Sequence, residues 1–248
     1  MRGAKLLIIA VLLTFLFGFF SKLIAAPLPK EVNIFYPHAG YDIALIKNFE
    51  SDLGVKFNGA KWYLNWETDF TQDVAKNFSS SGYLPELTWE PMIGGKGVKY
   101  TDVTSGVYDS YLENFALDVK AFGKPIRIVL APEMNTDWTP WGYQLAGNTD
   151  ITHKAFWKYI VNKFRSAGAT NAKWVWAPNV IPYGAKYSYA QMYPGDSYVD
   201  FTGLEGYNWG TSRSWSVWQS FDEVFYSSYK SLTAVTSKKI LITEIGST

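Results

Sequence analysis

The chain contains 248 residues, with a formal net charge of +1 and no cysteine. A near balance of acidic and basic residues argues against a nucleic-acid partner, because such proteins carry a basic surface. The lack of cysteine excludes disulfides and a thiolate nucleophile. Aromatic residues make up 18% of the chain, with 11 tryptophans, and such rings either fill a large core or stack on the C–H faces of sugars.

The first 29 residues have the features of an export signal. Arg2 and Lys5 precede an apolar run over residues 6–20, and small residues at 25–26 offer a cleavage site. The run is shorter than the roughly 20 residues of a membrane-spanning helix. Pro27 disfavours cleavage after residue 26, so an uncleaved membrane anchor is the alternative. Either way we expect residues 30–248 to form one secreted or extracytoplasmic domain.

Strand-like and helix-like segments then alternate along the chain. The alternation predicts a parallel sheet covered by helices. Seven repeats favour a (β/α)8 TIM barrel over an open doubly wound sheet, and no glycine-rich phosphate loop follows the first strand. Strands are expected over residues 32–36, 61–66, 84–89, 126–131, 173–177, 199–204 and 240–243, and helices over residues 41–53, 69–78, 108–122, 152–167 and 217–235.

The seventh predicted strand lies close to the last residue, Thr248. A complete (β/α)8 barrel has an eighth strand, which closes the sheet and removes its edges. We therefore expect a C-terminally incomplete barrel, truncated after strand seven, and a fragment of lowered stability.

Polar and aromatic residues gather where the predicted strands end. Catalytic residues of barrel enzymes lie at these ends, and paired carboxyl groups are what glycoside hydrolysis needs. The two histidines are far apart in the sequence, and one of them, His153, is expected on a helix surface, so neither a metal site nor a cofactor is expected. The residues at the strand ends are His38, Trp89, Glu90, Glu133, Asn135, Trp138, Trp141, Asn179, Glu205, Tyr207, Asn208, Trp209 and Glu244.

Four of these segments resemble signatures of glycoside hydrolase family 26, in the order in which that family carries them. They are residues 87–91 (LTWEP), 131–142 (APEMNTDWTPWG), 205–210 (EGYNWG) and 241–246 (LITEIG). The family holds β-mannanases, some mixed-linkage β-glucanases and β-1,3-xylanases. The resemblance runs from about the first strand to the end of the chain, and it implies a retaining mechanism in a (β/α)8 barrel.

The resemblance also implies residue roles. Glu133 corresponds to the acid/base and Glu244 to the nucleophile, with Tyr207 hydrogen-bonded to the nucleophile. In a retaining enzyme the two carboxyl groups lie ~5–5.5 Å apart. The chain departs from the family pattern at Pro132, where the family usually carries histidine, and at Thr136, where it usually carries glycine. Stacking platforms and other substrate contacts are expected from Trp138, Trp141, Trp209, Asn208, Asn135, Glu90, Trp89 and His38.

The leading expectation is a retaining endo-acting glycoside hydrolase, with β-1,4-mannan as the first substrate. A mixed-linkage β-1,3-1,4-glucanase on the same scaffold is the second. A non-catalytic carbohydrate-binding relative is the third, favoured by truncation and the missing histidine but opposed by the two intact carboxylates. The expected partner is a β-linked polysaccharide, without nucleic acid or an obligate protein partner.

Overall fold

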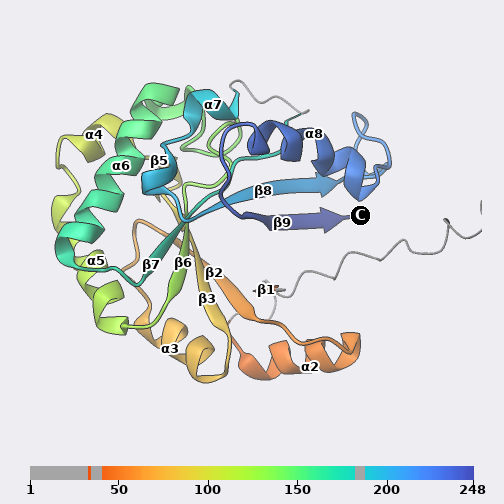
Figure 1. Ribbon diagram of the computed structural model, residues 1–248, viewed down its shortest axis with the longest axis horizontal. Helices are drawn as coiled ribbons and strands as arrows, with labels where there is room; N and C mark the ends of the chain where they lie inside the picture. The colour runs from red at the N-terminus through yellow and green to blue at the C-terminus, as the bar shows by residue number, and fades with distance from the viewer. Residues whose placement is uncertain (1–32, 35–40, 182–187) are drawn as a thin grey trace, which may run out of the picture. The chain divides into compact units, whose positions relative to one another are not determined.

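A computed structural model describes residues 33–34, 41–181 and 188–248. The expected export signal and His38 lie outside the described residues. Within them, seven parallel strands form one sheet (Figure 1). In spatial order these are β1 (Asn33–Ile34), β2 (Gly59–Asn65), β3 (Leu84–Glu90), β6 (Ile126–Leu130), β7 (Ala172–Trp176), β8 (Phe201–Asn208) and β9 (Ile240–Ser247).

Helices connect the strands as the sequence predicts. Three of them end at glycines in the left-handed conformation, Gly54, Gly123 and Gly168, because glycine adopts positive φ without strain. The last helix begins later than the expected residue 217, because a capping box between Ser220 and Glu223 starts it. The principal helices are α2 (Ile43–Leu53), α3 (Gln72–Ser80), α5 (Asp109–Phe122), α6 (Asp150–Ala167) and α8 (Phe221–Thr233).

Short elements that the sequence did not indicate lie in the loops. They are β4 (Met92–Ile93) and β5 (Lys96–Gly97), which form a hairpin, and the single-turn helices α4 (Tyr100–Thr104), η1 (Leu145–Gly147), α7 (Tyr189–Met192) and η2 (Asp196–Tyr198). No helix of the described segments is long and apolar enough to span a bilayer.

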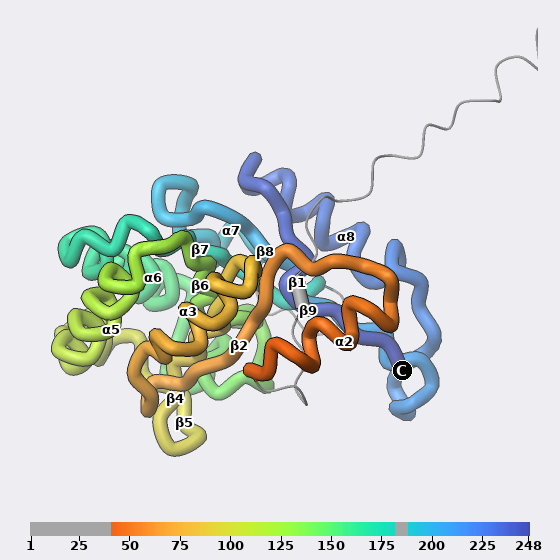
Figure 2. Tube along the Cα trace, turned by 90° about the horizontal axis from the view of Figure 1, so that it is seen from below, coloured from red at the N-terminus to blue at the C-terminus, as the bar shows by residue number. Residues whose placement is uncertain are grey.

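The sheet curls strongly on itself. Lys61 on β2 donates a hydrogen bond to the Thr243 carbonyl oxygen on β9, at 2.8 Å, although four strands separate β2 from β9 in the sheet. Figure 2 shows the same curl from below, with β2 and β9 near each other. Among the described strands, β9 pairs only with β8 and β1 only with β2. The fold is therefore an incomplete (β/α)8 barrel, and the open doubly wound sheet is excluded.

Successive side chains along each strand point to opposite faces of the sheet, so the apolar residues form two separate clusters. A small cluster of Val129, Val175 and Ala177, with Phe201 and Leu241 against it, fills the inside of the curl. The larger cluster lies between the outer face of the sheet and the helices, and most buried tryptophans belong to it. Many of the aromatic side chains are thus packed in the core. The members of this larger cluster include Trp62, Trp89, Trp157, Trp174 and Trp176.

His153 on α6 belongs to this outer core, so the expectation of a surface position is wrong. Its side chain is completely buried, and its Nε2 accepts a hydrogen bond from the Trp176 indole at 3.2 Å. Burial disfavours the charged imidazolium and lowers the pKa of His153 to about 3. The residue is therefore a neutral structural acceptor.

Candidate active site

Glu133 follows β6 in a turn that most side chains avoid. Ala131 and Glu133 both have positive φ, 47° and 51°, and such values in non-glycine residues are sparsely populated and often found at functional sites. The Glu133 amide donates to the Ala177 carbonyl at 2.9 Å. Ala177, the residue after the neighbouring strand β7, thus holds the turn in place.

Two donors fix the Glu133 carboxyl group. The Asn179 side-chain amide donates to Oε1 at 2.5 Å, and the Trp138 indole donates to Oε2 at 2.8 Å. Burial raises the pKa of Glu133, and the nearby charge of Glu244 adds to the rise, while the two hydrogen bonds oppose it. A raised pKa favours the protonated form, which a general acid needs.

Glu244 on β9 has a different environment. Tyr207 of β8 donates to its Oε2 at 2.5 Å, and Tyr63 of β2 donates to its Oε1. The Lys61 ammonium lies 3.9 Å from Oε1. Burial and the charge of Glu244 raise the pKa of both tyrosines, so both stay protonated as donors. Two hydroxyl donors and one cation suit an ionised carboxylate.

A bulge in β9 turns Glu244 inward. Leu204 pairs with Ile242, but Glu205 pairs with Glu244, so Thr243 is an extra residue on β9. Without the bulge, the two-residue period would direct residues 241 and 243 to one face and Glu244 to the other. Bulges often re-aim side chains beside active sites. This one places the Glu244 carboxylate inside the curl, on the same side as Glu205.

A buried ionic network lies beneath Glu244. Lys61 also lies 3.5 Å from Glu86, which lies 3.8 Å from Arg127. All three side chains are almost fully buried. Sequence reasoning missed Lys61 and Tyr63, although their spacing by two on β2 would have placed them on one face.

Two further glutamates lie near Glu244. Glu205, expected at the mouth, is instead completely buried, and burial followed by the charge of Glu244 raises its pKa well above the ordinary value. This shift favours the protonated form of Glu205, which would add no second negative charge beside Glu244. Burial, with the Glu244 charge, raises the pKa of Glu90 to about 7. Glu90 is partly exposed and can face a substrate.

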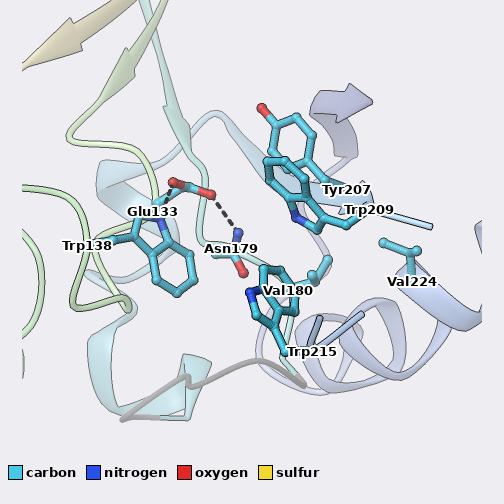
Figure 3. Close-up of a pocket in the computed structure, with 8 residues that line it drawn as sticks. All are labelled: Glu133, Trp138, Asn179, Val180, Tyr207, Trp209, Trp215 and Val224. Carbon is cyan, nitrogen blue, oxygen red and sulfur yellow. Dashed lines mark hydrogen bonds between the residues drawn. The ribbon is translucent and has the colours of Figure 1, made fainter. Parts of the chain in front are cut away.

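An aromatic cavity of about 600 Å³ opens beside Glu133 (Figure 3). Ligand pockets usually measure ~300–1,000 Å³. The expected platforms Trp138 and Trp209 both contribute to its wall. The lining residues are Glu133, Trp138, Asn179, Val180, Tyr207, Trp209, Trp215 and Val224. Sequence reasoning overlooked Trp215, which comes from the loop after β8.

The structure contradicts four of the expected substrate contacts. Trp141 is 3% exposed and donates its indole N–H to the Pro132 carbonyl at 2.8 Å, so it supports the turn from below. Trp89 is fully buried and stacks on Phe115, with centroids 4.2 Å apart, because it faces the helices. These two tryptophans are structural residues.

The other two corrections concern asparagines. Asn135 is buried, and it exchanges hydrogen bonds with the Asn179 backbone at 2.8 and 3.0 Å, which positions the donor to Glu133. Asn208 is buried as well, and its side-chain oxygen accepts the amides of Gly210 and Gln219. Both side chains are therefore buried behind the site, where they hold backbone groups in place.

The two departures from the family pattern have structural counterparts. The Thr136 hydroxyl donates to the Glu133 carbonyl at 2.8 Å, so this side chain secures the turn where the family usually carries glycine. Pro132 is buried, and it offers no side-chain donor in the place of the usual histidine. Among the described residues, no group of histidine and acidic side chains is arranged to hold a metal ion.

Comparison with known proteins supports the likeness seen in the sequence. Residues 101–245, more than half of the chain, match the family described as glycosyl hydrolase family 26. The chain is 41% identical over 207 residues to endoglucanase H of Acetivibrio thermocellus. That alignment covers 82% of this chain and 22% of the relative, so the chain spans about a fifth of that protein.

Solved structures share the fold at lower identity. A Bacillus subtilis mannanase superimposes with a TM-score of 0.59 at 19% identity, over 87% of this chain and 69% of that one. The family 26 domain of a Prevotella bryantii endo-β-mannanase/endo-β-glucanase gives 0.63 at 13% identity, over 88% and 83% of the two chains. These likenesses concern the barrel alone. The family match over residues 101–245, with the 41% identical relative, makes the assignment: this chain belongs to glycosyl hydrolase family 26.

Proposed function

We propose that the chain is a retaining endo-acting glycoside hydrolase with Glu133 as acid/base and Glu244 as nucleophile. The observation that carries the proposal is the contrast between the two carboxyl groups. Glu133 lies in a buried setting that raises its pKa. Glu244 accepts two tyrosine hydroxyls and lies 3.9 Å from a lysine ammonium. Glycosidases divide the acid and nucleophile roles between carboxyl groups in this manner.

The proposed reaction has two steps. In the first, Glu133 gives its proton to the glycosidic oxygen while the Glu244 carboxylate attacks the anomeric carbon, so that the C–O bond breaks and a glycosyl ester forms. In the second, ionised Glu133 takes a proton from water, which attacks the same carbon and releases Glu244. This route needs the two carboxyl groups ~5–5.5 Å apart, and that separation stays a prediction.

The first substrate we propose is a β-glucan. The relative named endoglucanase H shares 41% identity, whereas the mannanase structures share less than 25% and inform only on the fold. Mixed-linkage β-1,3-1,4-glucan is therefore placed before β-1,4-mannan. We further propose that the protein acts outside the cytoplasm, from the charged and apolar pattern of its first 29 residues.

Release of reducing sugar from mixed-linkage glucan, mannan and xylan tests the proposal. We expect rapid loss of glucan viscosity with little sugar released, as internal cleavage gives, and no activity in Glu133→Gln and Glu244→Gln variants. A protein that binds these glycans but releases no sugar would support the alternative of a non-catalytic binding relative. Release of single sugars from chain ends would contradict the endo mode.

A further inference from the structure

The loop between β8 and α8 carries two exposed tryptophans with different surroundings. Trp215 is 60% exposed and Trp218 is 66% exposed. Trp215 lines the cavity beside Glu133, whereas Trp218 lines a separate hollow formed with α8 and β9. The two tryptophans are thus similarly exposed but border different hollows.

The loop holds Trp215 in a defined place. Its ring contacts Trp209 at 6.1 Å between centroids, with 65° between the ring planes. The Arg213 guanidinium lies 5.4 Å from the Trp209 ring centroid. The Ser216 hydroxyl donates to the Gly210 carbonyl at 2.8 Å, which ties the two ends of the turn together. An aromatic ring ordered before a ligand arrives loses little conformational entropy on binding.

The cavity has a reactive part and an apolar part. Glu133 and Tyr207 carry the polar groups next to the reaction. Trp215, Val180 and Val224 also line the cavity, with an aromatic ring and aliphatic side chains. In Figure 3 the Trp215 ring lies apart from the Glu133 carboxyl, with Asn179 between them in this view. A ligand portion at Trp215 can therefore bind without reacting.

We propose that Trp215 forms a distal subsite on which a glycosyl unit of the glycan, away from the bond that breaks, stacks its C–H face. This inference rests on the proposed function, because it assigns the glycan to the same cavity. The chemical class of the ligand follows from the wall, since an indole face beside aliphatic side chains suits the apolar face of a sugar ring. Trp209 lies between this subsite and Tyr207, with ring contacts to both.

The test compares Trp215→Ala with the matched control Trp218→Ala on β-gluco-oligosaccharides of increasing length. Trp215→Ala should lower kcat/KM about fivefold to tenfold, through KM, only for substrates long enough to reach the subsite. The shortest hydrolysed oligosaccharide should be cut as by the wild type. Trp218→Ala should match the wild type at every length, and both variants should melt at the wild-type temperature.

Three results would overturn the subsite: no change in Trp215→Ala at any length, an equal loss at every length, or the same loss in Trp218→Ala. Calorimetric titration of the longest oligosaccharide separates this inference from the proposed function. If the wild type binds it without hydrolysis and Trp215→Ala binds it more weakly, the subsite stands and the catalytic proposal falls. If no binding and no hydrolysis occur, both fall.

Discussion

The hydrogen bond from Trp138 to Glu133 gives a sharp prediction about pH dependence. The Trp138 indole donates to Glu133 Oε2 at 2.8 Å and stabilises the ionised form of that carboxyl group. Trp138→Phe removes the donor and keeps an aromatic ring. The pKa of Glu133 should then rise further, because burial is opposed by one hydrogen bond fewer. Since the acid must be protonated to act, the alkaline limb of kcat/KM should move to higher pH.

The size of the displacement follows from the bond. Hydrogen bonds to charged groups contribute about 1.5–3 kcal/mol, and the lower end applies here because Trp138 is 50% exposed. One pKa unit corresponds to about 1.4 kcal/mol. The alkaline limb should therefore move upward by about one pH unit, even if the absolute kcat/KM falls through the smaller stacking surface.

The assay is kcat/KM for a β-glucan oligosaccharide across pH, for wild type, Trp138→Phe and Trp209→Phe. Trp209 lies in the same cavity, so its variant loses a similar ring area without touching the Glu133 hydrogen bonds. It should keep the wild-type alkaline limb. An unmoved limb in Trp138→Phe, or an equal displacement in Trp209→Phe, would refute the assignment of Glu133 as the acid.

Three further predictions concern stability, each read from urea unfolding. The folded pKa of His153, about 3, lies below its unfolded value near 6.5. The neutral side chain therefore contributes to the free energy of unfolding above about pH 6.5, and this contribution is lost as pH falls. Between pH 7 and 5 the free energy of unfolding of the wild type should fall by about 2 kcal/mol more than that of His153→Gln. Lys61→Met should cost about 3–5 kcal/mol because it removes the buried ammonium that lies beside both Glu86 and Glu244. Lys154→Met, from a partly exposed helical pair, should cost under about 1 kcal/mol. Trp141→Ala should cost about 3–5 kcal/mol as a core truncation, whereas Trp138→Ala, at a half-exposed position, should unfold at a urea concentration close to that of the wild type.

The order of strands and helices could be predicted because each strand is a short apolar run and most helices carry a local stop signal. Gly54, Gly123 and Gly168 mark helix ends in the sequence, and all three adopt the left-handed conformation at those ends. The hairpin of β4 and β5 escaped prediction because two-residue strands carry no periodicity.

Side-chain direction limited the prediction of the site. Trp89 and Glu90 are neighbours at the end of β3, and alternation sends Trp89 to the helices and Glu90 toward the cleft. A strict use of that period would have separated them and would have found Lys61 and Tyr63. The period fails at Glu244, where the extra residue Thr243 reverses the direction.

The exposure of loop residues could not be predicted from sequence periodicity. Trp138 and Trp141 lie three residues apart in one loop, yet one is half exposed and the other is 3% exposed. The burial of Trp141 depends on contacts with other segments. Tyr100 donates a hydrogen bond to the Trp141 carbonyl, and Trp141 donates one to the Pro132 carbonyl. Trp215 was missed for the same reason, since only the folded loop brings it to the cavity.

The most direct test of the account is to trap the covalent intermediate. A 2-deoxy-2-fluoro-β-glucoside with a good leaving group, preferably as an oligosaccharide, is incubated with the full chain, and the labelled peptide is identified by mass spectrometry. The account predicts one fluoroglycosyl unit attached to Glu244. A label on Glu90 or Glu205, or hydrolysis that proceeds with inversion and leaves no adduct, would contradict it.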